Sequence, residues 1–187
     1  MKLALIGRRF SNRGGVELYL QRLLEVLVRR GHEVHLFAET WGELPEQVQV
    51  HPVPIEYTRA NQPERFAEAM RQAVSREQFD CVFSLERTVW QDVHRAGGGI
   101  HQVWLQQRKK FARWWKKPFV GMGGFHRSTL AVQAQTYDPR NTGHVIVNSE
   151  MVRREILQHY DYPPERIHLV RNGVIPAQFQ NGDRTET

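Results

Sequence analysis

The chain has 187 residues, of which 40% are hydrophobic and 25% charged, so it can bury the core of one domain and falls outside the collagen-like and disordered classes. Its single cysteine, Cys81, excludes an intrachain disulfide, and no apolar run approaches the ~18 residues of a membrane-spanning helix. The net charge of +6 comes from one segment, because residues 93–137 carry eight cations and no acid. An anionic partner is expected to meet this segment.

The first predicted elements form a βαβ unit. Residues 2–7 have the apolar character of a short buried strand, and residues 33–38 have that of a second strand. Between them, the apolar side chains of residues 16–30 recur at the spacing of one helix face; they are Val16, Leu20, Leu23, Leu24 and Leu27. A strand, a helix and a strand at this spacing predict two parallel strands joined by a right-handed crossover.

The alternation of strands and helices continues along the chain. We expect strands at residues 48–54, 81–85, 99–103, 144–147 and 167–170, and helices at residues 63–78, 125–137 and 150–159, the last with Ser149 as its N-cap. The fold class is therefore α/β: a single Rossmann-like domain over residues 1–178, with a mostly parallel sheet and helices on both faces. Residues 179–187 are polar, and we expect a tail or the start of an interdomain linker there.

The loop between the first strand and the first helix is a candidate anion site. Ligands of open α/β sheets bind where strands end, and this loop carries Gly14 and Gly15 at the start of the helix. Without Cβ atoms, two glycines let a diphosphate approach the free N–H groups of the first helical turn. The loop matches neither the Gly-x-Gly-x-x-Gly fingerprint nor a P-loop, so a plain strand-to-helix turn is the alternative.

A segment rich in cations and aromatic rings spans residues 104–119, which we call the basic aromatic segment. Drawn as one helix, it places its aromatic rings on one side and its lysines on the other, with only Arg108 on the apolar side. Such a helix suits an anionic membrane surface, where each cation contributes on the order of 1 kcal/mol. The alternative is a surface helix whose rings pack on the domain core. Binding of nucleic acid by the cations and rings is a weaker alternative, because no recognised nucleic-acid-binding motif accompanies the segment. The candidate membrane-binding residues are Arg108, Lys109, Lys110, Phe111, Arg113, Trp114, Trp115, Lys116 and Lys117.

Two further residues are candidates for contact with a substrate. His101 comes shortly after three glycines, residues 97–99, at an expected strand end, and the glycines would let a substrate approach it. Asp92 is the last acid before the acid-free stretch and is a candidate either to face the basic segment or to orient a hydroxyl group. A structural hydrogen bond for His101 and a cap or surface charge for Asp92 are the alternatives. The other histidines show no metal-ligand spacing and one cysteine cannot build a zinc site, so no metal is expected.

Several short motifs occur in an order that one family shares. They are Gly14-Gly15-Val16-Glu17, Arg30-Gly31-His32-Glu33-Val34, Val147-Asn148-Ser149-Glu150, Pro164-Glu165-Arg166-Ile167 and Asn172-Gly173-Val174. In their order and spacing, from residue 1 to about residue 179, the chain resembles the N-terminal half of retaining family 4 glycosyltransferases of the GT-B fold. Residues 92–101, followed by a basic aromatic segment, are most similar to the lipopolysaccharide-core branch of that family.

The resemblance implies an enzyme whose active site lies in a cleft between two Rossmann-like halves. This chain would be the acceptor side, and the C-terminal donor domain, which holds most of the nucleotide in the family, is absent from it. By the same resemblance, Gly14 and Gly15 face the donor diphosphate and His101 positions donor and acceptor. Asp92 is a candidate for binding the acceptor hydroxyl, and no metal cofactor is expected.

The resemblance therefore predicts the acceptor-binding half of an enzyme that transfers a sugar from a nucleotide-sugar, expected to be a UDP-sugar, with retention of configuration. The expected acceptor is a lipid-linked glycan such as a lipopolysaccharide inner core. We expect the protein in the cytoplasm, bound peripherally to the anionic inner face of the cytoplasmic membrane. The 187 residues alone are expected to transfer little or no sugar. The alternative is a stand-alone Rossmann-like module that binds a nucleotide or phosphate without catalysis.

Overall fold

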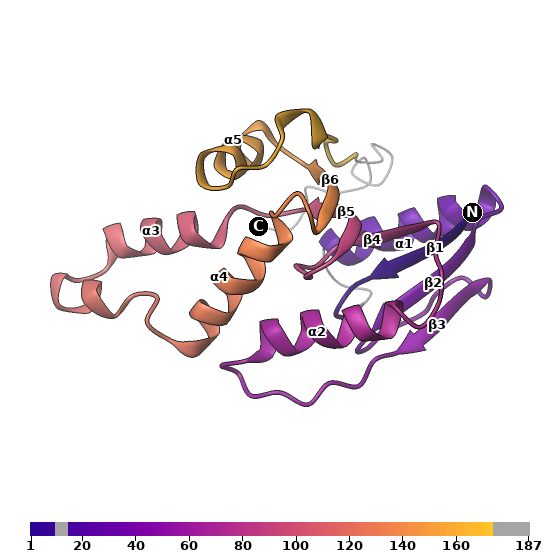
Figure 1. The fold of residues 1–187 in the computed structure, drawn as a ribbon, viewed down its shortest axis with the longest axis horizontal. Coiled ribbons are helices and arrows are strands. Elements are labelled where there is room, and N and C mark those ends of the chain that lie inside the picture. The colour runs from indigo at the N-terminus through magenta and orange to yellow at the C-terminus, as the bar shows by residue number, and fades with distance from the viewer. Residues whose placement is uncertain (10–14, 174–187) are drawn as a thin grey trace, which may run out of the picture.

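The computed structural model describes residues 1–9 and 15–173, which form an α/β domain on one sheet (Figure 1). All strand pairs are parallel, and the strand order is β3-β2-β1-β4-β5-β6-β7. The strands are β1 (Lys2–Ile6), β2 (Glu33–Ala38), β3 (Val48–Pro52), β4 (Cys81–Ser84), β5 (Gln91–Ala96), β6 (Thr142–Val147) and β7 (Ile167–Leu169). The chain winds outward from β1 in one direction and from β4 in the other, which is the expected Rossmann-like arrangement.

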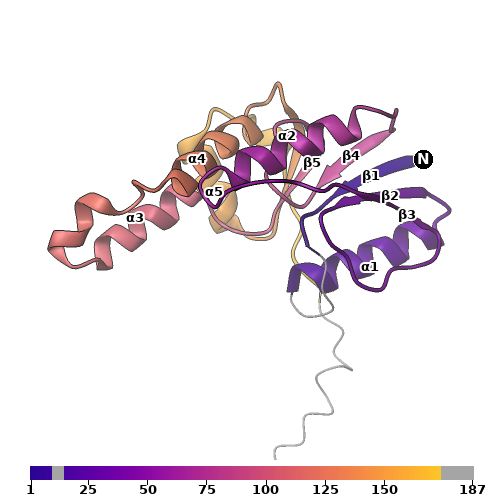
Figure 2. The same cartoon turned by 90° about the horizontal axis from the view of Figure 1, so that it is seen from below.

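Helices connect the strands. They are α1 (Gly15–Arg29), α2 (Gln62–Val74), α3 (His101–Phe111), α4 (Gly124–Thr136) and α5 (Glu150–His159), with 3-10 turns at Trp114–Phe119 and Pro164–Arg166. The βαβ unit predicted for the first 38 residues is confirmed, since α1 joins the parallel strands β1 and β2. The connection from β5 to β6 contains α3 and α4, and Figures 1 and 2 show α3 projecting away from the sheet.

Side chains of β1 point alternately to the two faces of the sheet. Leu3 and Leu5 belong to a buried cluster that includes residues of α1, whereas Ala4 and Ile6 belong to a second cluster that includes residues of α2. Figure 2 shows α1 and α2 on opposite sides of the strands. Because both faces of β1 are covered, the strand is apolar from Leu3 to Ile6 instead of alternating with polar residues.

A third buried cluster forms the other half of the domain. There, Val145 and Val147 of β6 pack with Val152 and Ile156 of α5. The start of α5 is where the sequence predicts it, because Oγ of Ser149 accepts the backbone N–H of Val152 at 3.4 Å. This bond satisfies one of the free donors of the first helical turn.

The sequence prediction is wrong for residues 91–103. Residues 91–96 form β5, which the hydrophobic pattern does not predict, and the predicted strand at residues 99–103 is instead the end of a loop and the start of α3. The pattern misses β5 because the strand buries His94 and Arg95. Such side chains are normally exposed, so a pattern-based prediction assigns them to the surface.

The predicted single helix over residues 104–119 is two separate elements. α3 ends at Phe111, the backbone of Ala112 and Arg113 is extended, with ψ of 144° and 143°, and a 3-10 turn follows. Pro118 lacks a backbone N–H, and in an α-helix its ring would clash with the carbonyl of residue 114, so an α-helix is disfavoured at residues 114–118, where the 3-10 turn forms. The single apolar face drawn for one helix is therefore not formed.

Candidate active site at the carboxyl edge of the sheet

The carboxyl ends of the parallel strands share one edge of the sheet, and the loops that follow them form one surface. Side chains cross-link three of these strand ends. Nδ2 of Asn148, after β6, donates to the carbonyl oxygen of Gly97, after β5, at 3.0 Å. Nη2 of Arg95 donates to Oδ1 of Asn172, after β7, at 2.8 Å. The ends of β5, β6 and β7 are thereby held in a fixed relation.

Arg95 is a buried cation below this edge. Only 5% of its surface is exposed, and its guanidinium carbon lies 3.8 Å from the centre of the Tyr19 ring on α1. A cation over an aromatic face and a charge-assisted hydrogen bond together offset part of the cost of burying the charge. Arg95 therefore connects α1 to the ends of β5 and β7, and it places a fixed positive charge at the edge where ligands of such sheets bind.

A hollow of about 500 Å³ opens at this edge. A Cβ atom on Gly99 would lie 2.8 Å from Oε2 of Glu155, whereas one on Gly98 would meet nothing within 4 Å. The close approach of the Glu155 carboxylate thus explains why residue 99 is glycine. The backbone of Gly98, in contrast, is open to a ligand. The residues that line the hollow include Gly97, Gly98, Gly99, Asn148, Ser149, Arg171 and Asn172.

His101 follows this glycine loop as the first residue of α3. Its backbone N–H donates to Oε1 of Gln133 at 3.0 Å, and its Nε2 lies 3.0 Å from Nδ1 of His126; both partners belong to α4. The imidazole also stacks on Trp104, with 5.4 Å between ring centroids. These contacts fix the orientation of the imidazole against α4 and Trp104.

The pKa of His101 is lowered to about 4, first by burial, then by the Arg87 cation and by His126. At pH 7 the imidazole is therefore neutral, so it can donate or accept a hydrogen bond but brings no positive charge to a leaving group. This state suits a residue that positions a substrate.

A second buried histidine gives a prediction about acid stability. Burial, followed by the charge of Arg87, lowers the pKa of His94 to about 3. The unfolded chain takes up this proton near pH 6.5, whereas the folded chain resists it until about pH 3, so stability falls as pH falls through this window. When the pH is lowered from 7 to 4.5, His94 is expected to reduce the free energy of unfolding by about 2–3 kcal/mol.

Urea unfolding at pH 7, 5.5 and 4.5 measures this loss. The matched variant is His94→Gln, which keeps a side-chain donor but does not titrate. Other acid-sensitive groups are common to both proteins, so the variant should lose less stability on acidification. An equal loss in the two proteins would contradict the assignment to His94.

Asp92 lies near the opposite end of β5 from His101. It is the second residue of the strand, and its Oδ2 accepts the backbone N–H of Val82 in β4 at 2.7 Å. About 13 Å of strand separates it from Ala96, where β5 ends. The structure does not bring Asp92 together with His101, so the prediction that Asp92 binds an acceptor hydroxyl gains no support from this geometry.

Gly15 is the first residue of α1, so it lies at a helix N-terminus that follows β1, as expected for an anion site. Gly14 and the rest of residues 10–14 lie outside the described residues. Contact of the two glycines with a diphosphate therefore stays a prediction.

The basic aromatic segment is exposed. No residue of α3 or of the 3-10 turn is buried, and Phe111, Trp114 and Phe119 are 87%, 78% and 70% exposed. The alternative that these rings pack on the domain core is thus excluded for these three side chains. Within residues 1–9 and 15–173, no helix has the length and apolarity to cross a membrane.

Cations and rings are interleaved along this segment. The guanidinium of Arg108 lies over the Trp104 ring at 5.2 Å, and that of Arg113 lies over the Trp115 ring at 5.0 Å. Rings and charges therefore share one projecting surface instead of occupying opposite faces of a helix. Trp114 and Trp115 pack edge to face within it, with centroids 5.6 Å apart.

A larger hollow, of about 1140 Å³, lies between α2 and α4 near the amino ends of the strands. Its lining includes Lys2, Asp80 and Asn141, which precede or begin strands, and the ion pair of Glu68 with Arg71. Ligands of open parallel sheets bind at the carboxyl ends, so we place the candidate active site at the smaller hollow, which is lined by the glycine loop that leads to His101.

Comparison with known proteins assigns the domain to a class of sugar-transferring enzymes. The sequence profile of Glycosyltransferase Family 4 matches residues 13–178, and the chain belongs to this family. The family resemblance inferred from the short motifs is confirmed, and so is the Rossmann-like fold of a GT-B half.

A sequence relative and a solved structure similar to this chain both carry the name WaaG. Lipopolysaccharide glucosyltransferase WaaG of Escherichia coli (strain K12) is 19% identical over 165 residues, which are 87% of this chain and 42% of the relative. The crystal structure of WaaG, a glycosyltransferase involved in lipopolysaccharide biosynthesis, matches with a TM-score of 0.81 at 17% identity, over 94% of this chain and 46% of that chain. The chain thus spans less than half the length of these relatives, and the structural likeness shows the fold alone.

Proposed function

We propose that the chain is the acceptor-side half of a glycosyltransferase that moves a sugar from a nucleotide-sugar, as a UDP-sugar, to a lipid-linked glycan such as a lipopolysaccharide inner core. The observation that carries the proposal is the neutral, oriented imidazole of His101, which begins α3 two residues after the glycine loop that lines the hollow, in a chain of family 4. The name of the E. coli relative supports this acceptor and a glucosyl donor.

The donor diphosphate would approach the N-terminus of α1. Gly15 begins that helix, whose free N–H groups favour an anion. The fixed charge of Arg95 lies nearby, in contact with Tyr19 of the same helix. The other half of the enzyme would hold the nucleotide and supply further charge for its phosphates, so this half alone should bind donor weakly.

Transfer with retention would proceed on one face of the sugar. The bond from the anomeric carbon to the diphosphate oxygen breaks, and the acceptor hydroxyl oxygen bonds to that carbon from the same side. The departing diphosphate oxygen takes the hydroxyl proton, so the step balances without a protein base. The proposal requires no metal ion, and it leaves orientation and charge stabilisation to the protein.

His101 would orient the transferred sugar and the acceptor. A neutral imidazole offers a hydrogen bond to a sugar hydroxyl, and the contacts with His126 and Trp104 hold the ring in place before the substrates arrive. Fixed geometry of this kind lowers the entropic part of the barrier.

The basic aromatic segment would hold the enzyme at the inner face of the cytoplasmic membrane. Its exposed rings suit the headgroup region, and its six cations suit anionic lipid. A lipid-linked acceptor is confined to that surface, so attachment there brings the active site to it. Such binding would be peripheral and reversible.

A transfer assay with radiolabelled UDP-glucose and lipopolysaccharide truncated to its inner core tests the proposal. The 187-residue chain alone is expected to transfer no sugar above background. Joined to the donor-side half of the E. coli relative, it is expected to transfer glucose. A folded fusion that binds UDP-glucose but transfers to no lipid-linked glycan would overturn the assignment, as would full turnover by the chain alone.

A further inference from the structure

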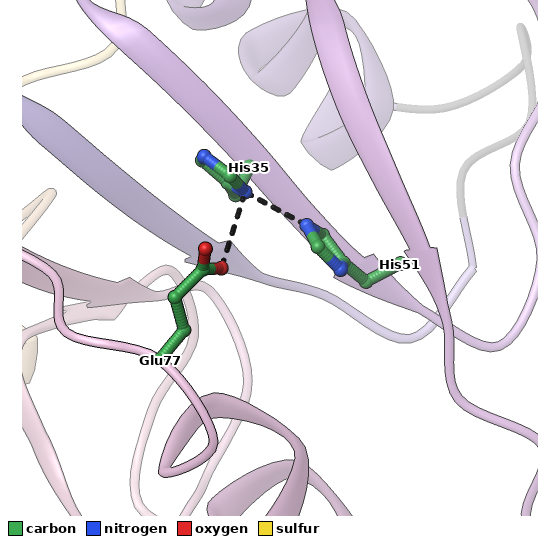
Figure 3. A group of neighbouring side chains, drawn as sticks. All are labelled: His35, His51 and Glu77. Carbon is green, nitrogen blue, oxygen red and sulfur yellow. Dashed lines mark hydrogen bonds and ion pairs between the residues drawn. The ribbon is translucent and has the colours of Figure 1, made fainter.

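Three side chains far apart in the sequence meet near the β3 edge of the sheet (Figure 3). They are His35 of β2, His51 of β3 and Glu77, which follows α2, and their ligand atoms all lie within 4.8 Å of one another. Nδ1 of His35 lies 2.7 Å from Nε2 of His51 and 3.7 Å from Oε2 of Glu77. The cluster runs from a buried imidazole through a half-buried one to an exposed carboxylate.

A second carboxylate orients the buried imidazole. Nε2 of His35 lies 2.9 Å from Oε1 of Glu33. A carboxylate at this distance accepts the Nε2–H, which leaves Nδ1 unprotonated and facing His51 and Glu77. Histidines that bind metals are held in the same way, with the second ring nitrogen donating to a carboxylate.

The charges around the cluster are suitable for a divalent cation. Glu33 and Glu77 are two acids, and Lys2 is one base, whose Nζ lies 2.7 Å from Oε1 of Glu77. That contact uses one carboxylate oxygen and leaves Oε2 on the side of the imidazoles. With neutral imidazoles, Glu33, Glu77 and Lys2 together carry a charge of minus one, and the Arg76 cation also lines the hollow beside His51 and Glu77.

We infer that His35, His51 and Glu77 form a binding site for a divalent transition metal, with Zn²⁺ as the expected ion. Two imidazoles and a carboxylate are a ligand set that zinc accepts, and a fourth position is left for water. Ligand atoms of a tetrahedral zinc ion lie about 3.3 Å apart, given bonds of about 2.0–2.1 Å. The cluster reaches this spacing through small side-chain shifts, and a hollow of about 330 Å³ lined by His51 and Glu77 gives access.

The ion would stabilise this edge of the domain. It would tie β2, β3 and the segment after α2 together, and these are three separate parts of the chain. Two strands, β1 and β4, separate β2 from β5, which leads to His101. The site is therefore independent of the proposed sugar transfer and would persist if that proposal failed.

Titration of the untagged 187-residue chain with Co²⁺, read by visible absorption, and Zn²⁺ competition test the site. One equivalent should bind, with the spectrum of a nitrogen- and oxygen-ligated tetrahedral ion, and Zn²⁺ should displace it. Mutation of a residue that only hydrogen-bonds to a metal ligand typically lowers metal affinity by about 10–100-fold. Because His51 and Glu77 would be ligands themselves, His51→Gln and Glu77→Gln are each expected to weaken Zn²⁺ binding by at least about 10-fold. Zn²⁺ should also raise the melting temperature of the native chain, whereas Mg²⁺ should not.

The control is a second histidine pair. Nδ1 of His144 lies 3.1 Å from Nε2 of His168, at the other side of the sheet, and no third ligand within the described residues joins them. His144→Gln should leave the affinity unchanged. Absence of saturable binding by the native chain would overturn the inference. Equal affinity of native chain, His51→Gln and Glu77→Gln, with circular dichroism showing all three folded, would overturn it too.

Discussion

Replacement of His101 by alanine, in a protein that carries both halves of the enzyme, is expected to lower sugar transfer by at least about 100-fold. Loss of one preorganised polar group at a transition state costs about 10²–10³ in rate. In this domain His101 is held by α4 through Gln133 and His126, so its alanine variant loses an oriented group. The measurement is kcat and KM for UDP-glucose with a truncated lipopolysaccharide acceptor.

The pattern of kinetic constants separates positioning from structural damage. Because the other half would bind most of the nucleotide, His101→Ala should lower kcat far more than it raises the donor KM. The matched control is His144→Ala, which removes an exposed imidazole on β6 and should keep native rates. Transfer by His101→Ala within twofold of native would show that His101 has no part in the reaction.

The second large effect concerns attachment to membranes. Replacing Trp114, Trp115, Lys116 and Lys117 together by serine is expected to weaken binding to anionic vesicles by at least about 100-fold. Each cation near an anionic surface contributes on the order of 1 kcal/mol, and each buried large apolar side chain about 1.5–3 kcal/mol. The four side chains are not buried in the domain, so the fold should be retained.

Sedimentation with vesicles of phosphatidylglycerol and phosphatidylcholine measures the partition coefficient. The control variant removes two exposed tryptophans and two exposed arginines elsewhere: Trp41, Trp90, Arg65 and Arg76, all replaced by serine. It should bind like the native chain, and native binding should weaken as salt is raised. Equal binding by native chain and the 114–117 variant would refute the membrane role.

Local patterns in the sequence were sufficient for most of the fold. The apolar run at residues 2–7, the helix face that includes Leu20 and Leu24, and the N-cap at Ser149 each reflect short-range physics, and all three correspond to observed elements. The alternation of strands and helices then implied a parallel sheet.

The elements that the sequence misses depend on distant partners. β5 buries Arg95, which is stable there because Tyr19 and Asn172 come from the opposite ends of the chain. No local pattern shows that a cation will find such partners. Pro118 is a local signal against an α-helix at residues 114–118, where the 3-10 turn forms, but it does not reach the break at residues 112–113.

The candidate site was predictable only in part. His101 could be singled out by the glycines before it, whereas Asp92 was chosen for its place in a charge pattern, which says nothing about the end of a strand on which a residue lies. His126 is 25 positions from its partner His101. The cluster of His35, His51 and Glu77 was missed because only the sheet order brings its members together.

The central claim, acceptor binding at the carboxyl edge, is tested most directly by NMR. The lipid-free inner-core oligosaccharide is titrated into the ¹⁵N-labelled 187-residue chain, and backbone amide shifts are followed. We expect saturable changes that cluster at Gly98, His101, Asn148 and Asn172. Changes confined to the hollow between α2 and α4, or no saturable change in a folded chain, would contradict the account.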